Sequence, residues 1–322
     1  MKITAKAPAN IAFIKYWGKR NEKLRIPANS SISMNLSNAF SITSVDFDSK
    51  FKEDVIKIDG IVSVGSEKDR VVTQLDLIRK ISGKSRYAEV VSDNNFPKAS
   101  GIASSASGFA ALTLAASLSA GLKLSKKDLS ILARLGSGSA CRSIPDGFVE
   151  WKEGSVSKDS YACSLYPADY WNICDAIAII GQTSKKVSST EGHMLAQSSP
   201  FYRTRILGML SKVREIKLAL KNKDFTKFGE ILEAEAINMH TVMMTSNPAL
   251  YYWLPKTLEI ILNVGDWRKK GIEAYFTIDA GPNVHIICEE KNANKLESNL
   301  SKLGNVKEIL VNRPAVGARV IN

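Results

Sequence analysis

The order of strand-like and helix-like segments places the strongest limit on the fold of this chain. Short alternating or apolar runs, typical of strands, occupy residues 2–7, 31–48, 87–92, 147–151 and 176–180. A mostly helical pattern follows from about residue 190 to 265. Strands then return at residues 273–279, 284–288 and 306–310. Because strands and helices do not alternate regularly, the pattern argues against a doubly wound sheet and predicts an α+β protein.

The change from strand-rich to helix-rich sequence near residue 185 predicts a domain boundary. We therefore expect one domain over residues 1–185 and a second over residues 186–322. The length of 322 residues agrees with this division, since domains commonly have about 150 residues. Further helices are predicted at residues 69–81, 109–122 and 293–303.

Composition excludes several classes of protein. Apolar residues make up 44% of the chain, which argues against disorder, and no apolar run approaches the roughly 18 residues of a membrane helix. The first six residues lack the apolar core of a signal peptide. The cysteines show no CxxC spacing and the histidines form no ligand cluster, so we expect a reduced, cytoplasmic protein without structural zinc.

The net charge of +12 predicts an anionic partner of some kind. Half of the excess lies between Arg203 and Lys227, where eight basic and two acidic residues give +6. Apolar residues recur there every three or four positions, at Ile206, Leu210, Val213, Ile216 and Leu220. The pattern predicts an amphipathic surface helix with a solvated basic face. Nucleic-acid binding is the alternative, although no recognition-module signature supports it.

A run of small residues from Pro97 to Gly108 leads directly into the helix predicted at residues 109–122. Small residues let a backbone approach an anion, and the free N–H groups at a helix start carry partial positive charge. Ser104, Ser105 and Ser107 add hydroxyl donors. The run contains neither GxxxxGK[ST] nor GxGxxG. We interpret it as a phosphate-binding loop, with close helix packing through small residues as the alternative.

A second small-residue segment, Gly136 to Ser143, contains Arg142. The planar guanidinium group matches the geometry of a carboxylate or a phosphate. The segment is therefore a candidate for a second anion site, and a tight turn with Arg142 on the surface is the alternative.

Two lysines four residues apart, Lys15 and Lys19, flank aromatic residues and a glycine. Compact ammonium groups suit a phosphorylated substrate. Scattered surface lysines are the alternative explanation.

Asp279 follows an apolar strand and precedes a Gly-Pro turn. An aspartate at a strand end can act as a general base, but such residues more often bind their own backbone in a turn. Together, two anion loops, two lysines, an arginine and an aspartate predict a phosphoryl-transfer enzyme with an anionic second substrate.

Seven stretches, in order along nearly the whole chain, resemble one known family. They are APANIAFIKYWGKR from Ala7, IPANSSISMNL from Ile26, NNFPKASGIASSASGFAAL from Asn94, GSGSACRS from Gly136, GFVEW from Gly147, SSTEG from Ser188 and FTIDAGPN from Phe276. On these motifs the chain resembles the diphosphomevalonate decarboxylases. That family belongs to the galactokinase, homoserine kinase, mevalonate kinase and phosphomevalonate kinase (GHMP kinase) superfamily.

The resemblance implies a two-domain GHMP-kinase-like α+β fold. Residues 1–185 would form the nucleotide-binding domain and residues 186–322 a ferredoxin-like helix–sheet domain, with the site in the cleft. It also implies ATP and Mg2+ as cofactors, (R)-5-diphosphomevalonate as substrate, and a homodimer that binds neither nucleic acid nor membrane. The products would be isopentenyl diphosphate, ADP, phosphate and CO2, as in the mevalonate pathway of isoprenoid biosynthesis.

The resemblance further implies roles for individual residues. Substrate contacts are implied for Tyr16, Trp17, Gly18, Lys19, Arg70, Ser137, Gly138, Ser139, Ala140, Cys141, Arg142 and Thr190. ATP contacts are implied for Asn94, Gly101, Ala103, Ser104, Ser105, Ala106 and Ser107. The implied catalytic residues are Asp279, Lys15 and Arg142. Asp279 would deprotonate the C3 hydroxyl group, Lys15 would keep Asp279 ionised, and Arg142 would hold the carboxylate that leaves as CO2.

Three departures from the family pattern put substrate affinity in question more than reaction class. Ser143–Gly147 reads Ser-Ile-Pro-Asp-Gly where the family commonly has an aromatic residue and paired glycines. Lys98 replaces a small or hydroxyl residue, and His193 stands where a methionine is often found.

Two other functions stay open on the sequence. A related mevalonate-type kinase would phosphorylate the 3-hydroxyl group without decarboxylation, which the joint presence of Asp279, Lys15 and Arg142 argues against. A basic nucleic-acid-binding protein is the remote alternative, and a salt-dependent gel shift well beyond nonspecific binding would favour it.

Overall fold

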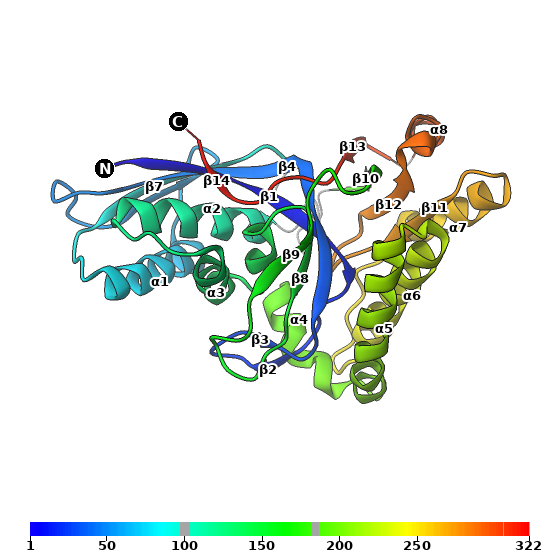
Figure 1. Cartoon of the computed structure of the whole chain (residues 1–322), viewed down its shortest axis with the longest axis horizontal. Coiled ribbons are helices and arrows are strands. Elements are labelled where there is room, and N and C mark those ends of the chain that lie inside the picture. Colours follow the sequence, from blue (N-terminus) through cyan, green and yellow to red (C-terminus); the bar gives the residue numbers. More distant parts are fainter. Residues whose placement is uncertain (97–103, 182–186, 305, 322) are drawn as a thin grey trace.

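The chain folds around two β-sheets that lie side by side along its long axis (Figure 1). The structure, a computed structural model, describes residues 1–96, 104–181, 187–304 and 306–321. Helices cover both sheets, and both chain ends lie near the first sheet (Figure 1). The mixture of mostly antiparallel sheets with helices segregated to parts of the chain confirms the predicted α+β class.

The first sheet is built from the N-terminal half of the chain and the last strand. Its strands are β1 (Ile3–Ile14), β4 (Ser31–Phe47), β5 (Val55–Ile58), β6 (Ile61–Val62), β7 (Ala88–Asn94), β8 (Phe148–Trp151), β9 (Ala162–Tyr166) and β14 (Arg319–Val320). The main path runs β14-β1-β4-β7-β5-β6, and β8 joins β4 to β9. A small separate sheet pairs β2 (Lys19–Asn21) with β3 (Ile26–Pro27).

Three helices pack against the first sheet (Figure 1). They are α1 (Gly65–Ser82), α2 (Ser104–Ser119) and α3 (Lys126–Gly136). The 3₁₀ helix η1 (Gly138–Ser143) begins two residues after the end of α3, so the segment predicted as a second loop is mostly a short 3₁₀ helix. Helix α2 begins inside the predicted phosphate-binding loop, whose residues 97–103 lie outside the described part.

Strand β1 continues well beyond Pro8, so the prediction that it ends there is wrong. Its pairing with β4 shifts register between Pro8 and Asn10 and then resumes. Such an irregularity accommodates a residue without an N–H donor inside a sheet. Every residue from Ala7 to Ile14 is buried, which carries the strand into the interior of the molecule.

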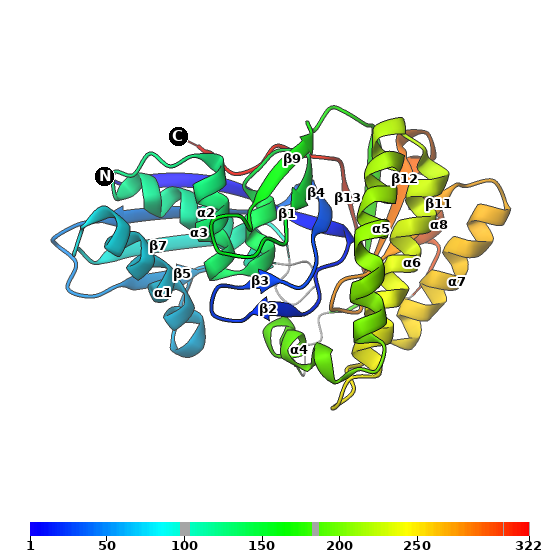
Figure 2. The same ribbon diagram turned by 60° about the horizontal axis from the view of Figure 1, so that its bottom comes forward.

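The second sheet has the order β11-β12-β10-β13 and is antiparallel throughout. Its strands are β10 (Ile173–Ile179), β11 (Ala274–Thr277), β12 (Val284–Glu289) and β13 (Glu308–Asn312). Four helices accompany them: α5 (Tyr202–Asn222), α6 (Phe225–Met244), α7 (Pro255–Lys269) and α8 (Glu290–Ser301). Figure 2 shows α5, α6 and α7 running side by side. Since β10 precedes residue 186, this sheet takes a strand from before the predicted boundary, and the division at residue 185 stays a prediction.

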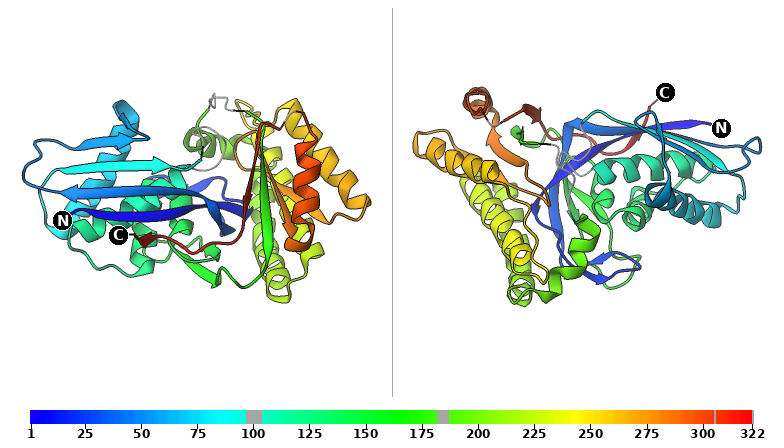
Figure 3. Two further views of the ribbon diagram at one scale, coloured as in Figure 1. Left: turned by 90° about the horizontal axis from the view of Figure 1, so that it is seen from above. Right: turned by 180° about the vertical axis from the view of Figure 1, so that it is seen from behind.

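One apolar core joins the inner half of β1 to the second sheet and its helices. Phe13 of β1 packs edge-to-face on Phe228 of α6, with ring centroids 4.8 Å apart. Such an aromatic pair adds about 1 kcal/mol beyond its buried area. Figure 3 shows the inner ends of β1 and β4 reaching the second sheet and its helices. The end of β1 is therefore held against α5 and α6.

The basic segment from Arg203 to Lys227 forms helix α5 and the start of α6. Lys223 adopts a left-handed conformation that ends α5, and the Asp224 side chain caps α6, so the prediction of one continuous helix is wrong. The basic face is solvated at most of its positions, as predicted, but Arg205 is an exception, because its side chain is 0% exposed. Leu210 is 61% exposed instead of facing the core.

No helix in the described ranges combines the length and the hydropathy that a membrane span requires.

Candidate active site

A cavity of about 470 Å³ lies where the end of β1, the start of α2, η1 and the β11–β12 turn meet. Most of the residues predicted to bind substrate or to act in catalysis line it. They are Lys15, Tyr16, Trp17, Lys19, Arg70, Ser137, Gly138, Ser139, Arg142, Thr190 and Asp279. Ser104 and Ser105 of the predicted ATP set line the same cavity.

Lys15 and Asp279 form an ion pair at the cavity wall. Lys15 follows the last residue of β1 and Asp279 follows β11, and Lys15 Nζ lies 2.6 Å from Asp279 Oδ1. The Lys15 side chain is 1% exposed and that of Asp279 is 24% exposed. Burial alone would raise the pKa of Asp279, but the charge and hydrogen bond of Lys15 hold that pKa below its usual value. The site therefore presents an ionised carboxylate to the cavity.

Arg142 is held by two side chains, Asn10 and Ser31, that do not line the cavity. Its Nε donates to Asn10 Oδ1 at 3.0 Å and its Nη1 donates to Ser31 Oγ at 2.8 Å. Asn10 also donates to Ser143 Oγ at 2.8 Å, which ties β1 to η1. Because these bonds use part of the guanidinium fork, its remaining donors are left for the cavity that Arg142 lines.

The segment after Lys15 wraps around His193. The Tyr16 and Trp17 ring centroids lie 4.1 and 4.5 Å from that of the imidazole, and the Gly18 N–H donates to its Nδ1 at 2.9 Å. Gly18 has a φ of 91°, and a Cβ on it would lie 2.3 Å from the Tyr202 hydroxyl, so only glycine fits there. Gly18 thus shapes the segment while its neighbours line the cavity.

His193 was not predicted as a site residue, although it stands where the family often has a methionine. Burial, followed by the charges of Lys19, Arg25 and Arg142, lowers its pKa well below 6.5. The imidazole is therefore neutral and can accept the Gly18 hydrogen bond. His193 lies three residues after Thr190 on α4 (Ser189–Leu195), so the helical spacing in SSTEGH could have identified it.

Ser188 and Ser189 also line the cavity and were not predicted. Ser188 caps α4, and Glu191 completes a capping box. The S-x-x-E pattern at Ser188 is a sequence signal for this helix start and could have placed both serines.

The two predicted anion segments meet at their serines. Ser105 Oγ lies 3.1 Å from Ser137 Oγ, and both residues line the cavity. Ala140 and Cys141, within η1, are fully buried and do not line the cavity. Burial raises the pKa of the Cys141 thiol to about 12, so that group is an inert packing residue.

The remaining members of the predicted ATP set lie elsewhere. Ser107 is buried and bonds Ser41 Oγ at 2.7 Å, and Asn94 accepts from the same hydroxyl at 2.6 Å. Neither lines the cavity, and Ala106 is 0% exposed. Gly101, Ala103 and the divergent Lys98 lie outside the described residues. The divergent Pro145 and Asp146 do not line the cavity either.

Positive charge dominates the described cavity wall. Arg25, which was not predicted, donates through Nε to Leu135 O at 2.9 Å, and Arg70 stacks over the Phe109 ring at 4.8 Å. The basic lining residues are Lys15, Lys19, Arg25, Arg70 and Arg142, against the single carboxylate of Asp279. One ionised carboxylate among several cations and two serine segments is typical of an enzyme that transfers phosphoryl groups between anionic substrates.

Two family models cover most of the chain. Residues 7–162 match the diphosphomevalonate decarboxylase-like N-terminal domain. Residues 176–313 match the mevalonate 5-diphosphate decarboxylase C-terminal domain. The chain belongs to the diphosphomevalonate decarboxylase family, which confirms the resemblance drawn from the motifs.

Individual relatives agree with the family models. The chain is 36% identical to the diphosphomevalonate decarboxylase of Debaryomyces hansenii over 313 residues, 91% of this chain and 81% of the relative. It is 38% identical to mevalonate diphosphate decarboxylase from Staphylococcus aureus, with a TM-score of 0.95 over 100% of this chain and 98% of that one. A structure described as MDDEF in complex with MVAPP, AMPPCP and magnesium is also 38% identical, with a TM-score of 0.94 over 100% and 99%.

Two buried neutral histidines make stability depend on pH. Burial, followed by the charge of Lys15, lowers the pKa of His240 to about 3, and that of His193 lies well below 6.5. Below about pH 6.5 the unfolded chain binds protons that the folded chain does not. The free energy of unfolding should therefore fall by about 2 kcal/mol between pH 7.5 and 5 on account of His240, and the contribution of His193 has the same sign.

Urea unfolding at the two pH values measures this loss. His240→Asn should show a smaller pH dependence than the natural chain, by about 2 kcal/mol. Equal pH dependence in both proteins would contradict the assignment of a neutral buried His240.

Proposed function

We propose that this chain catalyses the ATP-dependent decarboxylation of (R)-5-diphosphomevalonate to isopentenyl diphosphate, with release of ADP, phosphate and CO2. The observation that carries the proposal is the Lys15–Asp279 ion pair beside Arg142 in a strongly basic cavity. Membership of the diphosphomevalonate decarboxylase family supports the same reaction.

The cavity offers separate places for the substrate's two charged ends. Lys19, Arg25 and Arg70 suit the diphosphate, because they supply mobile and planar donors to its oxygens. Tyr16, Trp17, Ser137, Gly138, Ser139 and Thr190 complete that wall. Arg142 suits the carboxylate. The substrate's C3 hydroxyl group then lies toward Asp279.

Asp279 acts as the general base. Its carboxylate takes the proton of the C3 hydroxyl group as that oxygen attacks the γ-phosphoryl group of ATP. Lys15 keeps the carboxylate ionised and oriented before the transfer. When phosphate leaves C3, the electrons of the bond to the carboxylate form the new double bond, and CO2 departs. Arg142 holds the carboxylate in line until that bond breaks, and the enclosed site limits attack by water at C3.

ATP and Mg2+ fit the residues at the start of α2. No group of three or more His, Cys, Asp or Glu side chains is placed to hold a metal in the described residues. Mg2+ commonly keeps several waters and binds through substrate phosphates with few protein ligands. The hydroxyl groups of Ser104 and Ser105 would hold it together with the nucleotide phosphates. When bound, Mg2+ neutralises charge on the transferred phosphoryl group.

The remaining expectations about the protein's setting are part of the same proposal. The enzyme acts as a cytoplasmic homodimer on a small-molecule substrate, without a nucleic-acid or membrane partner. The Arg205 side chain is buried, so one residue of the basic face is not available to bind a nucleic acid.

A coupled assay of ADP release tests the proposed function. ADP formation should depend on diphosphomevalonate and should stay at the background rate with mevalonate, because Lys19, Arg25 and Arg70 have no diphosphate to bind in the second case. Equal stimulation by mevalonate would favour the alternative, a mevalonate-type 3-kinase.

A further inference from the structure

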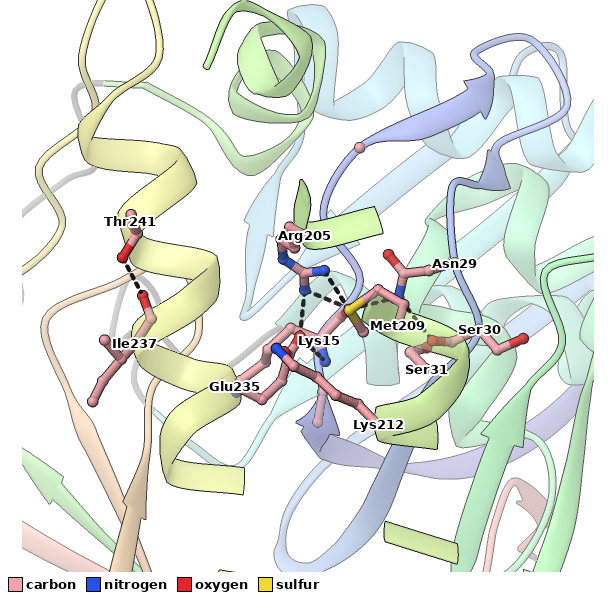
Figure 4. Close-up of polar contacts among 12 residues, drawn as sticks. Lys15, Asn29, Ser30, Ser31, Arg205, Met209, Lys212, Glu235, Ile237 and Thr241 are labelled. Carbon is pink, nitrogen blue, oxygen red and sulfur yellow. Dashed lines mark hydrogen bonds and ion pairs between the residues drawn. The ribbon is translucent and has the colours of Figure 1, made fainter. Parts of the chain in front are cut away.

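The backbone of Lys15 is held by side chains rather than by the sheet. Lys15 lies one residue beyond β1, where the ladder hydrogen bonds have ended. Its amide N–H donates to Glu235 Oε1 at 3.3 Å, and its carbonyl accepts from Arg205 Nη2 at 3.2 Å (Figure 4). Asn29 donates to the same carbonyl at 3.0 Å. Side chains of helices α5 and α6 therefore hold both backbone polar groups of Lys15.

Arg205 and Glu235 are an ion pair with no solvent contact. Both side chains are 0% exposed, and Arg205 Nη2 donates to Glu235 Oε1. Lys212, whose side chain is 28% exposed, bonds the other oxygen, Oε2, at 2.9 Å (Figure 4). Buried pairs of this kind are weak evidence for stability, since apolar residues of similar volume often serve equally well. The contacts of Arg205 and Glu235 with the Lys15 backbone indicate a role other than stability.

Neither Arg205 nor Glu235 lines the cavity. They reach the proposed chemistry through Lys15, whose backbone they hold and whose ammonium group contacts Asp279 at 2.6 Å. The charge of Glu235 also raises the pKa of that ammonium group, as one of the smaller influences on it. Because the Lys15 side chain is 1% exposed and closely packed, it has little room to rearrange, so the position of its Cα decides where its ammonium group lies. A small shift of this backbone would separate the ammonium group from the carboxylate.

We propose that Arg205 and Glu235 are positioning residues that fix the Lys15 backbone so that its ammonium group orients Asp279. This inference rests on the proposed function. It gives helices α5 and α6 a part in catalysis, since they carry Arg205 and Glu235 and cover the second sheet.

Glu235→Gln tests the proposal, because glutamine keeps the shape and removes the charge. The matched control is Glu233→Gln, on the same helix, where Glu233 pairs with Arg268 at 2.8 Å outside the cavity wall. We expect Glu235→Gln to lower kcat about 100-fold, as displacements near 1 Å do, with the KM values for both substrates within about twofold. Glu233→Gln should keep the natural kcat.

The pH profile separates positioning from loss of folded protein. The groups that face Asp279 are Lys15, Arg142, His240 and His285, and none of them is substituted. The acid limb of kcat/KM reports the pKa of the base. A displaced Lys15 holds that pKa down less effectively, so the limb should move to higher pH in Glu235→Gln. A smaller fraction of active protein would lower kcat without moving the limb.

Arg205→Lys serves if Glu235→Gln folds poorly. Lysine keeps the charge, but its ammonium nitrogen falls one bond short of Arg205 Nη2, the atom that donates to both Glu235 Oε1 and the Lys15 carbonyl. We expect the same displacement of the acid limb. A natural pH profile and kcat in the folded variant would overturn the inference, as would equal losses in Glu233→Gln. If the natural chain itself releases no CO2 from diphosphomevalonate, the proposed function fails instead.

Discussion

Asp279→Asn should abolish turnover while ATP binding survives. Asparagine keeps the shape of the side chain but cannot take the proton of the C3 hydroxyl group, so we expect kcat to fall by about 10⁴-fold. ATP affinity should stay within about threefold, because the proposed nucleotide contacts lie at the start of α2, at Ser104 and Ser105. The measurements are steady-state release of ADP and equilibrium binding of an ATP analogue.

The pKa of Lys15 provides an internal check on the Asp279→Asn variant. Burial lowers the pKa of Lys15, and the charge of Asp279 partly offsets that effect. Without the carboxylate the pKa of Lys15 should fall further, so the variant should lose stability at neutral pH rather than gain it. Near-natural turnover in a folded Asp279→Asn protein would rule out Asp279 as the general base.

Arg142→Gln should impair both binding and turnover of diphosphomevalonate. Glutamine leaves the substrate carboxylate without its guanidinium partner, so we expect kcat to fall about 100-fold and the KM for diphosphomevalonate to rise about 10-fold. ATP affinity should be unchanged. Initial-rate kinetics with each substrate varied in turn measure the two effects separately.

Arg20→Gln is the matched control for this arginine. Arg20 is about half exposed, pairs with Glu153 at 3.6 Å and does not line the cavity. Its replacement should leave kcat and both KM values unchanged. An unchanged KM for diphosphomevalonate in Arg142→Gln would contradict the role given to Arg142.

The fold class and most strands were predictable, because both depend on local periodicity. The length of β1 was not, since Pro8 usually interrupts a strand and only the register shift against β4 accommodates it. Arg205 was assigned to solvent for a related reason. Its partner Glu235 lies 30 residues away, and a helical pattern treats every arginine as polar surface.

The prediction of the candidate site depended on two kinds of information. Residue chemistry pointed to anions, but it could not bring together Lys15 and Asp279, which are 264 positions apart in the chain. The motif resemblance supplied that pairing, and the cavity contains both residues. His193 and Arg25 were missed because their place depends on how α4 and the β2–β3 hairpin fold against the cavity.

In the proposed reaction, phosphoryl transfer leads to loss of the carboxylate. The direct measurement uses diphosphomevalonate labelled at the carboxyl carbon and compares the labelled CO2 released with the ADP formed. We expect one CO2 for each ADP, with isopentenyl diphosphate as the organic product. ADP formed while the label stays in a 3-phosphorylated product would contradict it, because the site would then be that of a kinase.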